Sequence, residues 1–476
     1  MIFIQKHRKK IGKTLLVLFA GYLLYALICS SFMFRIHEPT ISTNDYEEVW
    51  VQNISKEAKP TDKVVLLEDP LWAAKARIDM INEAEDSLLV AYHALHPDES
   101  TEIFLSLLVN AADRGVEVQI LLDGVFHNLR GKEKQIVYTF IDHPHITLKY
   151  YEPLDLLKPW TWNNRLHDKL IIADDRFAMI GGRNMGNKYF VEDEKNFVND
   201  RDVMIMKSDQ HDASVIDEMR IYFDQLWTHT YSKPPKSSLT KRQKKRAQAK
   251  HEQLLTTLTQ HKGNQDHLFN KYIDWDRYAI EVDQITFIHN PIQRLNKEPW
   301  VWLAINDLMQ SAQETIIIES PYIIPTERML AFTDSLSITH DNVTMFTNSI
   351  ASTPNVLAFS GYQHHAKDLL DIGVNIFEHR GEHSIHGKSY IVDNKISVIG
   401  SYNLDARSTF LSTESMVIIE SEEFADQLIQ LMRDRVEQGK MVELTNGPVE
   451  ESFSVKLKQI FVTLLSYVTY FYQHLL

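Results

Sequence analysis

The positions of apolar and polar residues along the chain predict one membrane anchor followed by a long α/β region. Residues 14–34 form an uncharged apolar run, which as a helix would span roughly 30 Å, the thickness of a bilayer core. From residue 63 onward, short β-rich runs alternate with stretches of helical periodicity, a pattern typical of layered α/β domains. The expected fold is therefore α/β, preceded by a single transmembrane helix.

The same order of elements appears twice in that region. The pattern in the first part predicts helices over 71–85 and 103–114, and strands over 87–93, 116–123 and 146–151. In the second part it predicts helices over 300–311 and 361–370, and strands over 315–319, 342–347 and 374–378. Each series then reaches two apolar runs that are joined by a polar turn, which indicates a β-hairpin. We expect two similar halves, 63–232 and 276–445.

The two predicted hairpins carry the same polar residues at the same spacing. Residues 167–184 read HDKLIIADDRFAMIGGRN, and residues 386–403 read HGKSYIVDNKISVIGSYN. The shared positions are His167, Lys169, Asp174, Gly181 and Asn184 in one copy, and His386, Lys388, Asp393, Gly400 and Asn403 in the other. Two copies with every interval preserved indicate an internal duplication whose halves each supply part of one site.

These residue types suit chemistry at a phosphate. Side chains two apart on a strand share a face, so each histidine projects with its lysine. Brought together, the copies offer two imidazoles, two ammonium groups and two carboxamides, the last from Asn184 and Asn403. Cations and amides suit the oxygens of a tetrahedral phosphate, while one imidazole attacks and the other protonates the leaving oxygen. An ammonium beside each histidine opposes metal binding.

Four acids are candidates for roles in this site. An attacking imidazole needs its other nitrogen held, usually by a carboxylate. Asp202 and Glu414 each open an apolar strand-like run, so we pair Asp202 with His167 and Glu414 with His386. Asp174 and Asp393 belong to the repeated motif, but a carboxylate at a hairpin turn more often caps the turn than acts as a catalytic acid.

The doubled motif resembles that of the phospholipase D superfamily, and the chain is most similar there to bacterial cardiolipin synthases. The similarity extends over about residues 63–425 and includes 111–118, 164–169, 181–190, 319–325, 347–353 and 401–408. The first copy departs from the family in having Gly182 where serine is frequent, and Ser412 replaces the usual asparagine before the second acid.

The resemblance implies two tandem α/β sandwich halves with one shared active site. It implies that His167 attacks the phosphorus of a phospholipid and that His386 serves as acid and then base, although spacing alone leaves their roles interchangeable. Arg407, Tyr322 and Asn348 lie in family-like phrases and are candidate substrate-binding residues. The implied reaction needs no cofactor and no metal. Phosphatidylglycerol is the implied acceptor and cardiolipin the product; a phospholipase D hydrolase giving phosphatidic acid and a membrane-tethered nuclease remain alternatives.

Composition narrows the class of partner. The chain has 476 residues and a formal net charge of −14, which argues against nucleic acid because duplex binding needs a basic footprint. We expect anionic phospholipids and a membrane as partners instead. The single cysteine, Cys29, excludes intramolecular disulfides.

The remaining segments bear on membrane attachment. Residues 1–13 are basic and acids predominate after the apolar run, which places the N-terminus in the cytoplasm. The resemblance then implies a single-pass protein of the bacterial inner membrane with its catalytic domain on the outer face. The apolar run is longer than the core of a signal peptide, which favours an uncleaved anchor. The other expected segments are a tether over 35–62, a basic linker over 233–275 and a C-terminal amphipathic helix over 446–476; linker and helix could each contact lipid.

Overall fold

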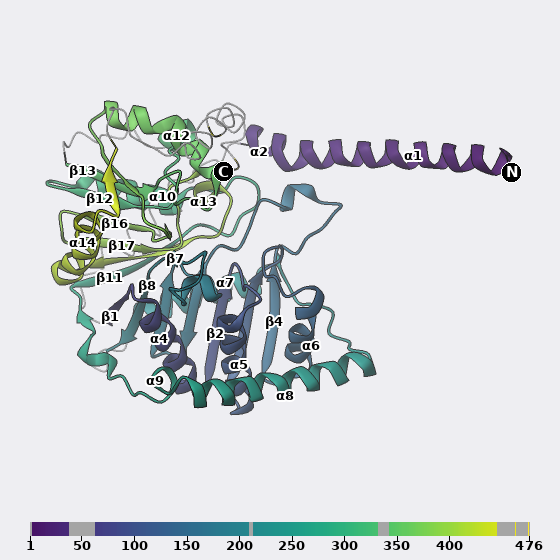
Figure 1. Cartoon of the computed structure of the whole chain (residues 1–476), viewed down its shortest axis with the longest axis horizontal. Helices are drawn as coiled ribbons and strands as arrows, with labels where there is room; N and C mark the ends of the chain where they lie inside the picture. Colours follow the sequence, from purple (N-terminus) through teal and green to yellow (C-terminus); the bar gives the residue numbers. More distant parts are fainter. Residues whose placement is uncertain are drawn as a thin grey trace.

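The computed structural model describes residues 2–37, 62–208, 213–331 and 342–444, together with Val462 and Leu475. Two α/β halves lie one above the other, and a long N-terminal helix projects from the side of the molecule (Figure 1). Most of the expected tether lies outside the described residues. So does the expected C-terminal helix, apart from Val462 and Leu475, which both pack against the core of the second half.

The first half is built on a mixed sheet with nine strands among the described residues. The three strands predicted over 87–93, 116–123 and 146–151 are parallel neighbours in this sheet. The first hairpin lies beside them and pairs antiparallel. In spatial order the strands are β10 (Ile280–Glu281), β1 (Asp62–Leu67), β8 (Asp202–Lys207), β6 (Phe177–Gly181), β5 (Lys169–Ala173), β2 (Ser87–Tyr92), β3 (Glu117–Asp123), β4 (Ile146–Tyr151) and β9 (Ser232–Lys233).

The second half repeats this plan on a sheet with eight strands among the described residues. The predicted hairpins are confirmed in both sheets, as β5–β6 and β16–β17. The order in the second sheet is β11 (Gln284–His289), β18 (Ser415–Glu420), β17 (Ile396–Gly400), β16 (Ser389–Val392), β12 (Ile316–Glu319), β13 (Val343–Asn348), β14 (Asn375–His379) and β19 (Met441–Glu443).

Helices cover the outer faces of both sheets, and the inner faces meet in a shared core. On the first half the outer layer is α4 (Pro70–Glu83), α5 (Glu99–Asp113) and α6 (Lys134–Asp142). On the second it is α10 (Trp300–Ser311) and α12 (Val356–Asp371). Apolar residues of both sheets join those of α7 (Val215–Thr228) and α14 (Glu422–Glu437) in one cluster. Burying this cluster fixes the two halves against each other.

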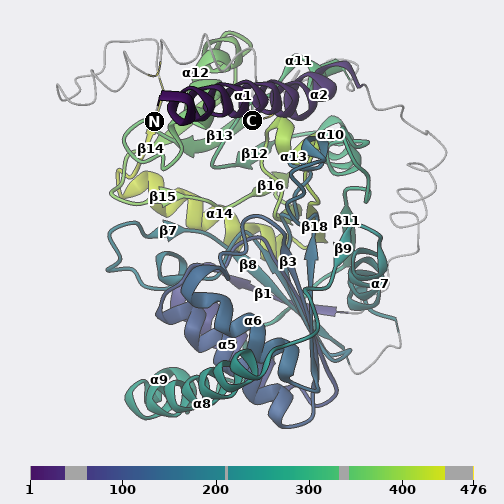
Figure 2. The same ribbon diagram turned by 90° about the vertical axis from the view of Figure 1, so that its right-hand side faces the viewer.

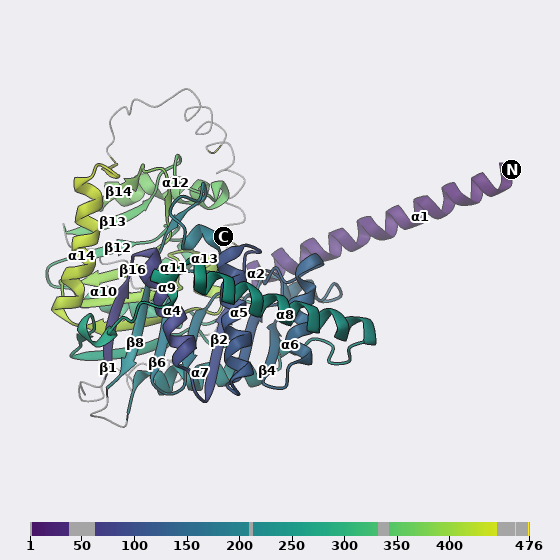
Figure 3. The ribbon, with the colours of Figure 1, turned by 60° about the horizontal axis from the view of Figure 1, so that its bottom comes forward.

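The expected basic linker contains a helix, α8 (Lys241–Asn264), that lies across the outer layer of the first half (Figures 2 and 3). Thr240 caps its N-terminus, with Gln243 completing a capping box. Leu254 and Leu258 are buried against the first half. The apolar side of the helix therefore packs on protein. The exposed basic residues lie near its N-terminus, at Lys241, Arg242, Lys244, Lys245 and Arg246.

The N-terminal helix α1 (Ile2–Leu27) continues through a π-helical turn (Ile28–Phe32) into α2 (Met33–Ile36). Its segment Lys13–Ile36 is long and apolar enough to cross a membrane. Phe34, at the base of this segment, is buried in the core of the second half. Asn296 and Arg328 donate hydrogen bonds to the carbonyl oxygens of Phe34 and His37. The candidate anchor is thus attached directly to the second half.

Candidate functional site

The two hairpins meet where short segments of the halves pair with each other. β7 (Val198–Asn199) runs parallel to β15 (Ser384–Ile385), and the His386 backbone N–H donates to the Asn199 carbonyl at 2.6 Å. On the other side, Leu166 forms a parallel bridge with Thr413, whose N–H donates to the Arg165 carbonyl at 2.9 Å. The segment that leads into each histidine therefore lies beside a segment of the opposite half.

His167 is held by a carboxylate of the other half. Its Nδ1 lies 2.9 Å from Glu414 Oε1 and 3.0 Å from Oε2. Glu414 is fully buried and also accepts a hydrogen bond from the Ser401 hydroxyl. We expected Glu414 to hold the histidine of its own half, and that expectation is wrong, because the pairing across the halves brings Glu414 to His167.

His386 is held by Asp200 and not by either acid that we expected. Its Nδ1 lies 2.6 Å from Asp200 Oδ2. Asp202, which we assigned to His167, instead accepts hydrogen bonds from Arg77 at 2.9 Å and Arg183 at 3.1 Å, as a fully buried ion pair. The assignment of Asp202 as an orienting acid is therefore wrong.

Strand register explains why Asp200 takes this place. Gly181 lies opposite Asp202 and Gly400 lies opposite Met416. The residue two positions earlier is Asp200 in the first half and Glu414 in the second, so these two acids are equivalent. A Cβ on Gly182 would lie 2.1 Å from Asp200 Oδ1. Asp200 therefore occupies the space that a serine side chain would fill at position 182.

Both lysines of the motif are buried next to the histidines. The Nζ atoms of Lys169 and Lys388 donate to the carbonyl oxygens of His167 and His386. Burial lowers the pKa of Lys169 to about 7, although Glu414 opposes the shift. Burial likewise lowers the pKa of Lys388 to about 8, with Asp200 and Glu414 opposing. Two desolvated ammonium groups in one site favour an anionic ligand.

The environment keeps both imidazoles neutral before a ligand binds. Burial and the charge of Lys169 hold the pKa of His167 well below its usual range. Burial and Lys388 lower the pKa of His386 to about 4. Burial would raise the pKa of Asp200, but the charge of Lys388 and the hydrogen bond from His386 bring it well below its usual value. Asp200 is therefore ionised. Burial raises the pKa of Glu414, although the charge of Lys169 opposes this shift.

The turn acids of the motif are structural. Asp174 has a positive φ of 51° and accepts hydrogen bonds from the backbone N–H groups of Glu85, Asp86 and Ser87. Asp393 has a φ of 52° and accepts from Gln313, Glu314 and Thr315 in the same manner. Each carboxylate therefore joins its hairpin to the loop before a central strand. The assignment of Asp174 and Asp393 as catalytic residues is therefore wrong, and the expected capping role is confirmed.

The two asparagines of the motif differ in the hydrogen bonds that their side chains make. Asn184 accepts from the Ala94 N–H at 3.2 Å and donates to the Tyr189 hydroxyl at 3.2 Å. The Tyr189 ring contacts that of His386, with centroids 6.0 Å apart. Asn403 Oδ1 is buried and has no hydrogen-bond partner in the described part of the chain. Asn403 is thus the carboxamide that is less committed to the fold.

Of the three candidate substrate-binding residues, Asn348 has a structural role, so its assignment to substrate binding is wrong. Its carboxamide donates to the Ile385 carbonyl at 2.9 Å and accepts from the Ile385 N–H at 2.9 Å, so it fixes the residue before His386. Arg407 donates to the Leu475 carbonyl at 2.6 Å, and Tyr322 is partly buried against the second core. Substrate contacts by Arg407 and Tyr322 stay predictions.

Asp168, between the histidine and lysine of the first motif, is a residue that sequence reasoning missed. It is fully buried and accepts hydrogen bonds from the Tyr222 hydroxyl at 3.2 Å, from the Ser415 hydroxyl at 2.7 Å, and from Thr413. Thr413 and Ser415 flank Glu414, so Asp168 joins the two halves beside the first histidine. The signal was the exchange of aspartate for glycine between the shared histidine and lysine of the two copies.

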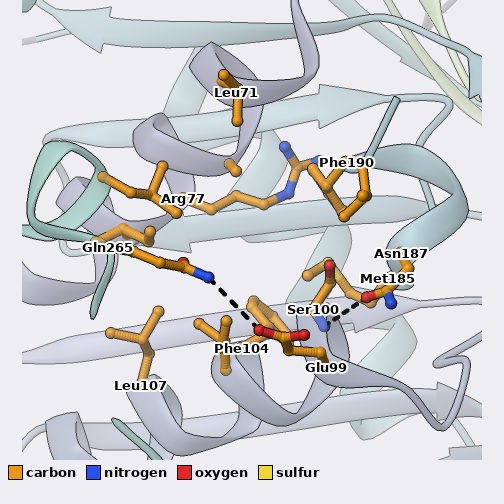
Figure 4. Close-up of a pocket in the computed structure, with 15 residues that line it drawn as sticks. Leu71, Arg77, Glu99, Ser100, Phe104, Leu107, Met185, Asn187, Phe190 and Gln265 are labelled. Carbon is orange, nitrogen blue, oxygen red and sulfur yellow. Dashed lines mark hydrogen bonds between the residues drawn. The ribbon is translucent and has the colours of Figure 1, made fainter. Parts of the chain in front are cut away.

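Two further features lie apart from the histidines. A mainly apolar cavity of about 300 Å³ lies between α4, α5 and the loop that carries Met185 and Phe190 (Figure 4), and it offers few groups for phosphate chemistry. Asp113, His143 and His251 could together hold a metal ion. However, His143 Nδ1 accepts the His145 N–H at 3.1 Å. This leaves the proton on Nε2, the atom that faces Asp113.

Comparisons with known proteins identify the family. A family described as cardiolipin synthase, phospholipase D-like domain, matches residues 77–227 and 305–435. Cardiolipin synthase C of Escherichia coli is 28% identical over 402 residues, which cover 76% of this chain and 82% of that protein. Cardiolipin synthase 1 of Staphylococcus epidermidis is 25% identical over 410 residues, 85% of this chain and 74% of that protein.

A solved structure supports the fold. The phosphatidylserine synthase of Haemophilus influenzae superposes with a TM-score of 0.62 and 14% identity, covering 92% of this chain and all of that one. At this identity the likeness concerns the fold alone. Taken with the two matched ranges, one in each half, these findings show that the chain belongs to the family of cardiolipin synthases with phospholipase D-like domains.

Proposed function

We propose that this chain transfers a phosphatidyl group, through a phosphohistidine on His167, to phosphatidylglycerol and so makes cardiolipin. The relatives support a phospholipid phosphatidyltransferase of the phospholipase D superfamily. The observation that carries the proposal is the reciprocal arrangement of the two imidazoles. Each has its Nδ1 held by a buried acid of the opposite half, which leaves the two Nε2 atoms for the chemistry.

In the first step, His167 Nε2 attacks the phosphorus of the donor phospholipid. The bond from phosphorus to the headgroup oxygen breaks, and His386 gives a proton to that oxygen. A neutral His167 is suited to attack because its lone pair is free. The negative charge of the bound phosphodiester offsets the ammonium groups beside His386, which raises the pKa of this imidazole and lets it carry the proton.

In the second step, His386 removes the proton from a hydroxyl group of the acceptor. The acceptor oxygen attacks phosphorus, and the phosphorus–nitrogen bond to His167 breaks. Throughout both steps Lys169 and Lys388 balance the charge on the phosphoryl oxygens, as preorganised cations in a site with little water. The Glu414 carboxylate stabilises the charge that develops on the His167 ring. By the positive-inside bias, the site would lie on the outer face of the inner membrane.

Product analysis of the purified full chain tests this function. The substrates are vesicles of phosphatidylglycerol and phosphatidylethanolamine, and the readout is mass spectrometry of the lipids. We expect cardiolipin from the wild-type chain and none from His167→Asn or His386→Asn. Phosphatidic acid as the sole product would show that the chain is a hydrolase and not a transferase. Cleavage of DNA without turnover of lipid would refute the proposal.

A further inference from the structure

We propose that the loop over residues 152–163 inserts into the lipid interface beside the anchor helix. This loop follows β4 and ends four residues before His167. Its partner is a phospholipid bilayer surface. The proposal goes beyond the transfer reaction, and only the activity arm of its test rests on the proposed function.

The tip of the loop exposes apolar side chains at high density. Leu154 is 49% exposed, Leu156 is 58% exposed and Leu157 is 77% exposed. Trp160 and Trp162, which follow within the same loop, are half-buried. Exposed leucines next to tryptophan are typical of elements that lie at a membrane interface. A monomeric protein in water rarely gathers such residues on one short segment.

The loop lies directly on the candidate anchor. The Tyr22 hydroxyl donates to the Leu156 carbonyl at 3.1 Å, and the Tyr25 hydroxyl donates to the Leu157 carbonyl at 2.9 Å. Both tyrosines lie inside the segment Lys13–Ile36 that can cross a membrane. Figure 1 shows the chain after β4 extending alongside the base of α1. When α1 occupies a bilayer, the exposed leucines therefore meet lipid.

The backbone of the loop is prepared for surroundings without water. The two tyrosine hydroxyls satisfy the carbonyls of Leu156 and Leu157. The Leu157 N–H donates to the Asp155 carboxylate at 2.9 Å, and the Trp162 indole N–H donates to the Asp155 carbonyl at 2.8 Å. A backbone group without a hydrogen-bond partner is strongly disfavoured in hydrocarbon. Internal partners remove much of this cost where the loop meets the bilayer.

The base of the loop is joined to the site. The Arg165 guanidinium donates to the Glu152 carbonyl at 2.8 Å and to the Thr161 carbonyl at 3.0 Å, which closes the loop at both ends. Arg165 is two residues before His167 and accepts the Thr413 N–H through its own carbonyl. An inserted loop thus places the bilayer surface next to the histidine that would attack a phospholipid.

Depth-dependent fluorescence quenching tests the insertion. In full-length protein carrying Cys29→Ser, a polarity-sensitive dye is attached at Leu157→Cys or at the control Leu71→Cys. Leu71 is a 51% exposed leucine on α4. The protein is reconstituted into vesicles of phosphatidylglycerol and phosphatidylethanolamine. We expect lipid-borne spin labels to quench the dye at 157 and aqueous iodide to quench the dye at 71. Equal quenching by iodide at both positions would overturn the proposal.

An activity measurement tests the consequence. For the variant Leu156→Asp/Leu157→Asp we expect activity on vesicles to fall about tenfold or more, and activity on monomeric short-chain phosphatidylglycerol to stay unchanged. Leu71→Asp, the matched control, should change neither. Equal losses on both substrates, or no loss on vesicles, would contradict insertion. If the wild-type chain turned over no phospholipid, the proposed function would fail while the quenching result would still decide the role of the loop.

Discussion

At the scale of single residues, each histidine depends on a carboxylate that the other half supplies. Glu414 contacts His167 and Asp200 contacts His386. All of these groups lie in buried surroundings, where a lost partner is costly. Asp202 is as buried as Glu414, but its partners are Arg77 and Arg183. Two acids of similar burial therefore have different partners, a histidine of the motif for Glu414 and a pair of arginines for Asp202.

The first prediction separates the roles of these two acids. Glu414→Gln should lower kcat about a hundredfold or more with little loss of stability, because the amide cannot stabilise a charged His167 ring. Asp202→Asn should lower the free energy of unfolding by about 3–5 kcal/mol, because it leaves buried guanidinium groups without a counter-charge. Turnover assays and chemical denaturation measure the two effects. A folded, inactive Asp202→Asn enzyme beside an active Glu414→Gln enzyme would reverse the assignment.

The second prediction concerns pH. Lys169 and Lys388 have pKa values lowered by burial to about 7 and about 8, and only the protonated ammonium attracts a phosphodiester. Above these values the free enzyme loses positive charge, so kcat/KM should fall as pH rises from about 7 to 9. The Lys388→Arg variant, whose guanidinium stays charged, should remove the upper part of this decline in a kcat/KM profile. A profile that rises over this range would contradict the assignment.

At the scale of elements, the two hairpins are alike in backbone and different in what surrounds them. Asp168 in the first joins three hydroxyl groups, and its counterpart in the second is Gly387. A Cβ on Gly387 would lie 2.3 Å from Glu319 Oε1 and 3.1 Å from Arg201 Cζ. Glu319 and Arg201 belong to an ion-pair network that also bridges the halves. A side chain at this position would therefore have to displace a buried ion pair.

The third prediction follows from that contact. Gly387→Ala should destabilise the protein by about 1–3 kcal/mol and displace the neighbouring His386, because overpacking forces the buried ion pair to move. Gly263→Ala in α8 is the control, since a Cβ there would meet nothing within 4 Å and alanine favours a helix. Thermal unfolding of both variants provides the measurement. A Gly387→Ala protein as stable as wild type would show that the contact is easily relieved.

The sequence predicted the elements better than their partners. The hairpins, the strands β2, β3 and β4 and the helix α10 are local patterns of period two or 3.6, and they are confirmed. The choice of Asp200 over Asp202 could not be made locally, because both acids lie two apart on one face of the chain and strand register decides between them. The pairing of each histidine with an acid of the other half depends on how the halves pack, and residue spacing in the sequence does not reveal this packing. The apolar loop 152–163 has no helical or strand period that would single it out.

At the scale of the whole molecule, one chain brings together both copies of the motif and a candidate membrane anchor. The anchor contacts the first half through Tyr22 and Tyr25 and the second through Phe34. The shared core between the sheets holds the two motif copies together. The candidate membrane span, the loop 152–163 and the paired histidines are therefore connected by direct contacts within one chain.

The fourth prediction tests whether the site is complete within one chain. Mixing or co-expressing the His167→Asn and His386→Asn variants should restore no activity, because each site takes both histidines from the same polypeptide. Lipid products from the mixture, compared with those of each variant alone, give the readout. Recovery toward a quarter or more of wild-type activity would instead require a site that forms between chains.

The most direct test of the account is to trap the covalent intermediate. Purified full-length His386→Asn protein, which lacks the base for the second step, is mixed with phosphatidyl-p-nitrophenol, whose headgroup leaves without a proton from the missing acid. The reaction is quenched under alkaline conditions, and the protein is digested for mass spectrometry. We predict a phosphatidyl adduct on the peptide that contains His167, and we predict that adding Glu414→Gln strongly reduces it, although Glu414 belongs to the other half. An adduct on another residue, or one that Glu414→Gln leaves undiminished, would contradict a site shared between the two halves.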